Sequence, residues 1–143
     1  MSPSDYPRAR VIQAYAPEAG QAVQLQAGDI VYVGEESSAY PHWVRIRVPD
    51  GRKTWIPEAY VRGNDGEEGR ILVDYDSREL ETKGGEVVTM LLEIFGWAWV
   101  RTEDGRAGWL PLEVLALLPL RPDFVILVVA DERGLGPLEQ TAD

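Results

Sequence analysis

One pattern occurs twice in this sequence and constrains the fold more than any other feature. Residues 43–57 contain Trp-Val-Arg, then Asp-Gly-Arg, then Trp-Ile-Pro, and residues 99–111 contain Trp-Val-Arg, Asp-Gly-Arg and Trp-Leu-Pro in the same order. Asp-Gly is a strong signal for a tight hairpin turn, because glycine accepts the positive φ that such turns need. Apolar and polar residues alternate on both sides of the turn, as in strands with one buried face. The pattern therefore predicts two copies of a β-hairpin.

Each hairpin belongs to a longer repeat of short strands. Strand-like segments precede the hairpins at corresponding places, in chain order 10–15, 30–33, 70–75 and 87–92. A tight helical turn is expected after each hairpin, at 58–60 and at 112–114, before a last strand. Many short strands at this spacing are typical of a barrel or sandwich. The sequence predicts an all-β protein with five strands in each repeat.

The boundary between the repeats is expected at residues 64–69. Three glycines and three acidic residues lie within positions 63–69, a composition that does not form a hydrophobic core. We therefore expect a first domain at 8–63 and a second domain at 70–118. The connection is short, so the two domains are expected to lie close together.

The two ends of the chain differ from the repeats. Residues 1–7 are rich in proline, serine and aspartate and are expected to form a flexible arm. Residues 119–143 form a C-terminal extension that includes an apolar, β-branched run at 124–129. Such a run is typical of a buried or association-prone strand. We expect it either to pack on its own chain or to pair across a homodimer.

Charge and cysteine content restrict the partners and the compartment. The formal net charge is -10, and residues 64–118 carry twelve acidic against five basic side chains. Nucleic-acid binding needs a basic stripe, which is not evident here, so a basic or neutral partner is expected. The chain contains no cysteine, which excludes disulfides, thiol catalysis and thiolate metal sites and favours a reducing compartment. Because no apolar run reaches roughly 20 residues and no secretory signal is seen, we expect a cytoplasmic protein that does not insert into membranes.

Residues for enzyme chemistry are scarce. The only histidine, His42, lies in a polar stretch without a clustered ligand in the sequence. A metal site or a catalytic triad needs several such groups together. The sequence also lacks a complete phosphate-binding loop, and solvation explains its many carboxylates. We therefore expect a non-catalytic protein with no cofactor and no metal.

Several short motifs, in the right order, resemble the Src-homology-3 family, including its bacterial variants. The family opens with Ala-Leu-Tyr-Asp-Tyr, which Ile-Leu-Val-Asp-Tyr at 71–75 resembles. Its turn before the second strand looks like Lys-Gly-Gly-Glu at 83–86, and its Trp and Pro motifs look like the two hairpins. The resemblance covers residues 8–62 and 69–118. It implies two small five-stranded barrels in tandem.

The resemblance also implies peptide binding. Members of the family hold proline-rich segments between flat aromatic rings, and a polyproline helix is already extended, so little entropy is lost on docking. A neighbouring acidic loop pairs with an arginine or lysine of the ligand. The expected partner is therefore a protein or peptide that is extended or proline-rich and carries a basic residue.

The family's groove positions fall on residues of both repeats. They are Tyr15, Trp43, Pro57 and Tyr60 in the first repeat, Tyr75, Trp99 and Pro111 in the second, and the acidic residues Asp76, Glu79 and Glu81. Neither set is complete, because Gln13, Val73 and Val114 stand where the family has tyrosine. The alternative is a structural or assembly protein whose domains pack on each other or self-associate and leave no free groove.

Overall fold

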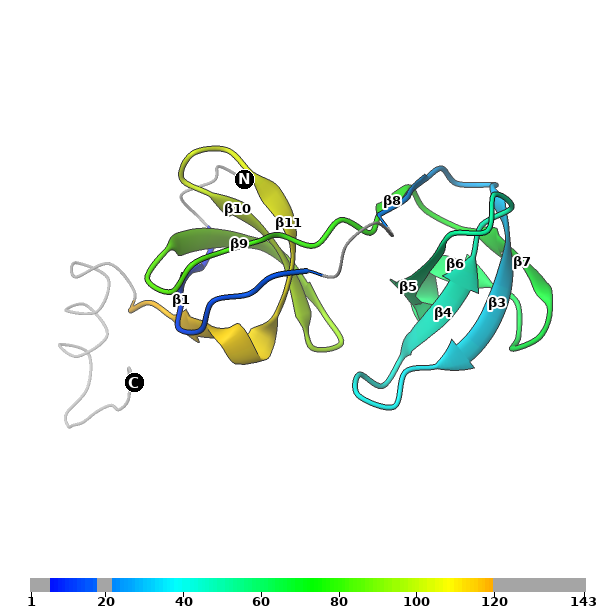
Figure 1. Cartoon of the computed structure of the whole chain (residues 1–143), viewed down its shortest axis with the longest axis horizontal. Coiled ribbons are helices and arrows are strands. Elements are labelled where there is room, and N and C mark those ends of the chain that lie inside the picture. The colour runs from blue at the N-terminus through cyan, green and yellow to red at the C-terminus, as the bar shows by residue number, and fades with distance from the viewer. Residues whose placement is uncertain (1–5, 18–21, 120–143) are drawn as a thin grey trace, which may run out of the picture.

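The computed structural model describes residues 6–17 and 22–119, and its regular structure is almost entirely β-strand (Figure 1). The strands are β1 (Arg8–Val11), β2 (Gln24–Leu25), β3 (Ile30–Glu36), β4 (Trp43–Arg47), β5 (Lys53–Pro57), β6 (Val61–Arg62), β7 (Glu68–Ile71), β8 (Tyr75–Asp76), β9 (Val87–Ile94), β10 (Trp97–Thr102), β11 (Ala107–Pro111) and β12 (Leu115–Leu117). Short 3-10 helices follow the hairpins, at η2 (Glu58–Tyr60) and η3 (Leu112–Val114). The prediction of an all-β protein is confirmed, whereas the apolar run at 124–129 lies outside the described residues.

Ten of the strands form two five-stranded sheets, and β2 and β8 form a two-stranded sheet. We call the sheet β5-β4-β3-β7-β6 and its loops the first lobe, and the sheet β11-β10-β9-β1-β12 and its loops the second lobe. Both predicted hairpins are present, because β4 pairs with β5 and β10 pairs with β11. Figure 1 shows the two lobes side by side, with the chain passing between them twice.

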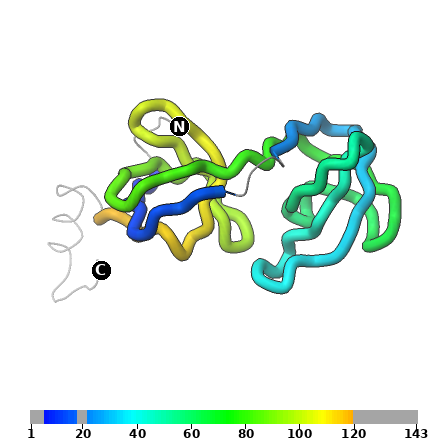
Figure 2. The backbone as a smooth tube through the Cα atoms, in the orientation of Figure 1, coloured from blue at the N-terminus to red at the C-terminus, as the bar shows by residue number. Residues whose placement is uncertain are grey.

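The first strands of the two repeats are exchanged between the lobes. Strand β1 pairs with β9 and β12 of the second lobe, where Arg10 lies opposite Ala116. Strand β7 pairs with β3 and β6 of the first lobe, where Arg70 lies opposite Arg62. The first lobe is therefore continuous in sequence from β3 to β7, while the second lobe combines β1 with β9 to β12 (Figure 2). This pairing differs from the predicted division into domains at 8–63 and 70–118.

A hairpin between β6 and β7 explains the exchange. Residues 64–69, expected to form a linker, instead contain a tight turn and the first residues of β7. The Glu67 N–H donates to the Asn64 carbonyl, and the Gly66 N–H donates to the Val33 carbonyl on β3. Because so few residues separate β6 from β7, the second strand folds back beside the first.

Gly69 shows why the composition of this stretch was misleading. A Cβ atom at this buried position would lie against the carbonyl oxygen of Arg62 and 2.8 Å from Cγ2 of Val33. Glycine is therefore needed here for a close backbone approach inside the sheet, a role that an isolated glycine in a strand often has.

The two connections between the lobes run antiparallel to each other. Strand β2 pairs with β8, where Leu25 lies opposite Tyr75, and a further bridge joins Tyr15 to Thr82. Leu25 and Tyr75 belong to the core of the first lobe. No helix in the described residues is long and apolar enough to cross a membrane.

Candidate functional site

Aromatic side chains gather where the two lobes meet. Trp43 begins β4 of the first lobe, and its ring centroid lies 5.5 Å from Trp109 and 6.0 Å from Trp97, both of the second lobe. Tyr40, in the loop before β4, lies 5.1 Å from Trp97. The indole Nε1 of Trp43 donates a hydrogen bond of 2.8 Å to the Phe95 carbonyl. Inclined ring pairs at these distances are favourable, so this cluster holds the lobes together.

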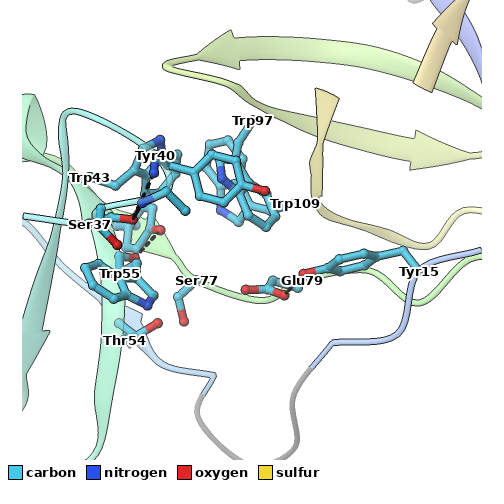
Figure 3. A pocket seen from close by; sticks show the side chains of 13 residues that line it. Tyr15, Ser37, Tyr40, Trp43, Thr54, Trp55, Ser77, Glu79, Trp97 and Trp109 are labelled. Carbon is cyan, nitrogen blue, oxygen red and sulfur yellow. Dashed lines mark hydrogen bonds between the residues drawn. The ribbon is translucent and has the colours of Figure 1, made fainter. Parts of the chain in front are cut away.

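A cleft of about 470 Å³ lies beside this cluster (Figure 3). Its walls come from the first lobe, from both connections and from the second lobe, and the lining residues are Tyr15, Ser37, Ser38, Ala39, Tyr40, Trp43, Thr54, Trp55, Tyr75, Ser77, Glu79, Trp97 and Trp109. In Figure 3, Tyr40 and Trp97 lie above Ser77 and Glu79. The volume and the aromatic lining are those of a typical ligand site.

The aromatic donors around the cleft are largely committed to acceptors of the same chain. These bonds are Trp43 Nε1 to the Phe95 carbonyl, Trp109 Nε1 to the Asp76 carbonyl, Tyr75 Oη to the Trp55 carbonyl, Tyr40 Oη to Glu113 and Tyr15 Oη to Glu79. Their lengths run from 2.5 to 2.8 Å. The cleft consequently offers a ligand mainly ring faces, the Glu79 carboxylate and serine and threonine side chains.

The electrostatic environment of the cleft is negative. Burial, together with the hydrogen bond to Glu113 and the charges of Glu113 and Glu79, raises the pKa of Tyr40 to about 12. Burial, followed by the charge of Glu79, raises the pKa of Tyr75 well above its usual range. Both phenols therefore stay neutral beside carboxylates, and the cleft favours a cationic group over an anionic one.

The groove residues predicted in the first repeat are not all in one place. Trp43 is only 4% exposed and Pro57 is fully buried, so little of either faces solvent. Tyr60 is half-buried, with its ring 5.9 Å from Tyr75. Because the first strands are exchanged, Tyr75 joins the first lobe, and Tyr15 packs against the core of the second.

In the second repeat, Trp97 takes the place that the sequence pattern assigned to Trp99. Trp97 lies opposite the buried Pro111, as Trp43 lies opposite Pro57. Trp99 lies opposite Trp109 and outside the cleft lining, with its ring under the Arg78 guanidinium at 5.6 Å. Trp97 precedes Pro111 by as many residues as Trp43 precedes Pro57, so this spacing identifies Trp97 from the sequence.

Of the three predicted acidic residues, only Glu79 lines the cleft. The Asp76 carboxylate accepts a hydrogen bond from Gln24 and lies 3.6 Å from Nη2 of Arg78. Glu81 is exposed and stands outside the lining. The acidic contribution to this cleft therefore comes from one carboxylate of the predicted loop.

Two carboxylates, those of Glu36 and Glu58, lie close to His42 in the structure. Ligand atoms of Glu36, His42 and Glu58 lie within 4.8 Å of one another, and all three side chains are exposed. The ring Nδ1 of His42 lies 3.0 Å from Glu58, and its backbone N–H donates to Glu36. These hydrogen bonds account for the proximity of the three side chains.

No protein-family model matches this chain, and no curated protein matches it in sequence. The cleft is lined by seven aromatic side chains and by one carboxylate, that of Glu79.

Proposed function

We propose that this chain is a tandem Src-homology-3-like protein that binds extended, proline-containing peptides without catalysis, in the cleft between its lobes. Two five-stranded sheets, each with a Trp-to-Pro hairpin followed by a 3-10 turn, support the likeness to two small barrels. The sequence motifs at 71–75 and 83–86 support the likeness to the Src-homology-3 family. The exchange of β1 and β7 is a departure from two independent barrels in sequence order.

The observation that carries the proposal is the set of partly exposed rings around one cleft. Tyr15, Tyr40, Trp55 and Trp97 are half-buried, and all four line the same space. Flat rings at low side-chain entropy suit proline and an extended backbone. Glu79 supplies a partner for a basic residue of the peptide.

The charge and composition of the chain support a basic partner. A net charge of -10 favours a cationic peptide over a nucleic acid. The absence of cysteine fits a reducing compartment such as the cytoplasm. We therefore propose that the chain binds its peptide partner in the cytoplasm.

The test is a titration of the full chain with proline-rich peptides, with and without a basic residue, followed by tryptophan fluorescence and calorimetry. Tyr40→Ala should weaken binding about tenfold or more, as expected for a central aromatic contact. Tyr32→Ala is the matched control, because Tyr32 is a 41% exposed tyrosine of the first lobe outside the cleft. The proposal fails if no peptide alters the signals, or if both variants bind as the unmodified chain does.

A second candidate, a structural or assembly role, is favoured by the burial of Trp43. This ring is 4% exposed and its indole N–H is bonded to the opposite lobe, so part of the aromatic surface serves packing. In that case Tyr40→Ala should lower the stability of the protein, and no peptide should bind to it or to the unmodified chain. Sedimentation of the full chain and of a chain ending at Leu118 tests the expected self-association through 124–129, because loss of a dimer would support it.

A further inference from the structure

We propose that the cleft seats a quaternary ammonium group, the head of a trimethylated lysine carried by the peptide ligand. This inference rests on the proposed peptide-binding function and names the side chain that the cleft selects. It follows from the orientation of the rings, from the position of the charge and from the hydrogen bonds already made around the cleft.

The rings around Trp97 are inclined to one another. Tyr15 makes an angle of 82° with Trp97 at 6.2 Å, Tyr40 makes 63° at 5.1 Å, and Trp43 makes 58° at 6.0 Å. Trp43 is 4% exposed and packs against Trp97, so the rings that face the cleft here are the half-buried Tyr15, Tyr40 and Trp97, whose inclination presents surfaces from more than one direction. A rounded cation can contact several of them at once, which is how aromatic cages recognise quaternary ammonium groups. A planar guanidinium stacks instead on a single ring face.

The Glu79 carboxylate lines the same space as these rings. Figure 3 shows the Glu79 carboxylate below Tyr40 and Trp97, with Tyr15 to one side. Tyr15 Oη donates to Oε1 of Glu79 at 2.5 Å, which holds ring and carboxylate together. Tyr40 Oη donates to Glu113 at 2.6 Å. A cation between the rings and Glu79 is attracted from both sides.

Hydrogen bonding also distinguishes a trimethylated lysine from an unmodified lysine as a ligand of the cleft. A primary ammonium brings three N–H donors and a tightly held hydration shell, which a binding site must replace. Many acceptors around this cleft already receive a bond. One oxygen of Glu79, Oε1, accepts from Tyr15, Ser77 Oγ accepts from the Val23 N–H, and Ser37 Oγ accepts from two backbone N–H groups. A trimethylammonium group has no N–H donor and needs no acceptor, so its transfer from water into the cleft costs less free energy.

The test compares one proline-containing peptide in four forms that differ at a single side chain: lysine, trimethyllysine, arginine and the uncharged carbon analogue of trimethyllysine. Calorimetry should show trimethyllysine binding about tenfold more tightly than lysine and than the uncharged analogue, a difference of about 1.4 kcal/mol. Equal affinity of all four forms, or the tightest binding by lysine or arginine, overturns the inference while leaving peptide binding intact. Binding of none of the four removes the proposed function itself.

Choline and its uncharged analogue 3,3-dimethylbutanol test the cage on the unmodified chain without a peptide. Choline should shift the tryptophan resonances and the alcohol should not. Equal shifts would identify an apolar pocket and contradict the proposal. Phosphatidylcholine vesicles are a further probe, and capture of vesicles without binding of the trimethyllysine peptide would also contradict it.

A pair of variants on one loop assigns the effect to the cleft. Glu79→Gln removes the charge that lines the cleft and should reduce the preference for trimethyllysine over its uncharged analogue severalfold. Glu81→Gln is the matched control, because Glu81 is exposed and outside the lining. Circular dichroism confirms that both variants fold. An unchanged preference in Glu79→Gln would rule out the assigned role of this carboxylate.

Discussion

The indole Nε1 of Trp43 donates a hydrogen bond of 2.8 Å to the carbonyl oxygen of Phe95 and thereby joins the two lobes. Phe95 lies in the turn between β9 and β10 with φ of 47°, a conformation uncommon for a residue with a side chain. Its ring also lies 4.7 Å from the ring of His42, next to Trp43. The contact therefore combines a partly buried hydrogen bond with ring packing, and it fixes one wall of the cleft.

The Trp43–Phe95 bond should contribute measurably to stability. Trp43→Phe keeps an aromatic ring but removes the donor, so the free energy of unfolding should fall by about 1–2 kcal/mol. Trp55→Phe is the control, because Trp55 is a half-buried tryptophan of the adjacent strand with its ring under Arg45. Urea unfolding measures both. A Trp43→Phe protein that loses no more stability than Trp55→Phe would show that the bond is not important.

The close approach at Gly69 should not tolerate a side chain. Gly69→Ala would force the new methyl group against Arg62 and Val33 and should destabilise the protein by about 1–3 kcal/mol or more. Gly84→Ala provides the comparison, because a Cβ there meets no atom within 4 Å. Thermal unfolding should show a lower midpoint for Gly69→Ala alone. Equal midpoints for the two variants would argue against the β6–β7 pairing.

Strand β1 should stabilise the second lobe in spite of its distance in sequence. Val11 is 1% exposed within the core of that lobe, whereas its neighbour Ile12 is 60% exposed. Val11→Ala should cost roughly 1–3 kcal/mol and Ile12→Ala should cost little. Hydrogen exchange should show the loss of protection in β9 to β12. Loss of protection in β3 to β6 instead would place β1 in the first lobe.

Stability should fall at high pH partly through Tyr40. The folded state raises the pKa of Tyr40 to about 12. Because this value lies above that of a free tyrosine, the resulting stabilisation is complete below about pH 10 and is lost as the pH rises toward 12. The raised pKa of Tyr75 acts in the same direction. Urea unfolding across this range should show a smaller decline for Tyr40→Phe than for the unmodified chain, and an equal decline would exclude the contribution of Tyr40.

The sequence allows the strands and turns to be predicted well. The hairpins β4–β5 and β10–β11 and the 3-10 turns at η2 and η3 lie where the Asp-Gly and Pro motifs place them. These features are local, because turn chemistry and alternation act over a few residues.

The partners of the first strands could not be predicted in the same way. Arg8–Val11 and Glu68–Ile71 have the same alternating burial, so either strand fits beside either sheet. The choice depends on the connection after β6, whose glycines and acidic residues resemble a linker in composition. Only the structure shows that Gly69 is buried between β6 and Val33.

The candidate site was predicted in part. Tyr15, Trp43, Tyr75 and Glu79 do line one cleft, although the family pattern had divided them between two grooves. Four further aromatic residues of the lining were not among the predicted groove residues: Tyr40, Trp55, Trp97 and Trp109. Trp97 was not predicted because the Trp-Val-Arg triplet of the second hairpin is displaced by two positions relative to its proline. Tyr40 was not predicted because it lies in a polar loop, and only the structure shows its contacts with Trp97 and Glu113 of the other lobe.

The exchange of first strands brings residues of both repeats to one cleft, and a cysteine cross-link tests it most directly. The chain has no cysteine of its own, so Arg10→Cys combined with Ala116→Cys can be oxidised without background. These positions are opposite each other on β1 and β12, at a spacing that a disulfide can bridge. The comparison is Arg10→Cys with Arg62→Cys, the pair expected if β1 stayed with its own repeat, since Arg62 lies opposite Arg70. Non-reducing electrophoresis should show an intramolecular disulfide in a monomer for the first pair and none for the second, and the reverse result would contradict the exchange.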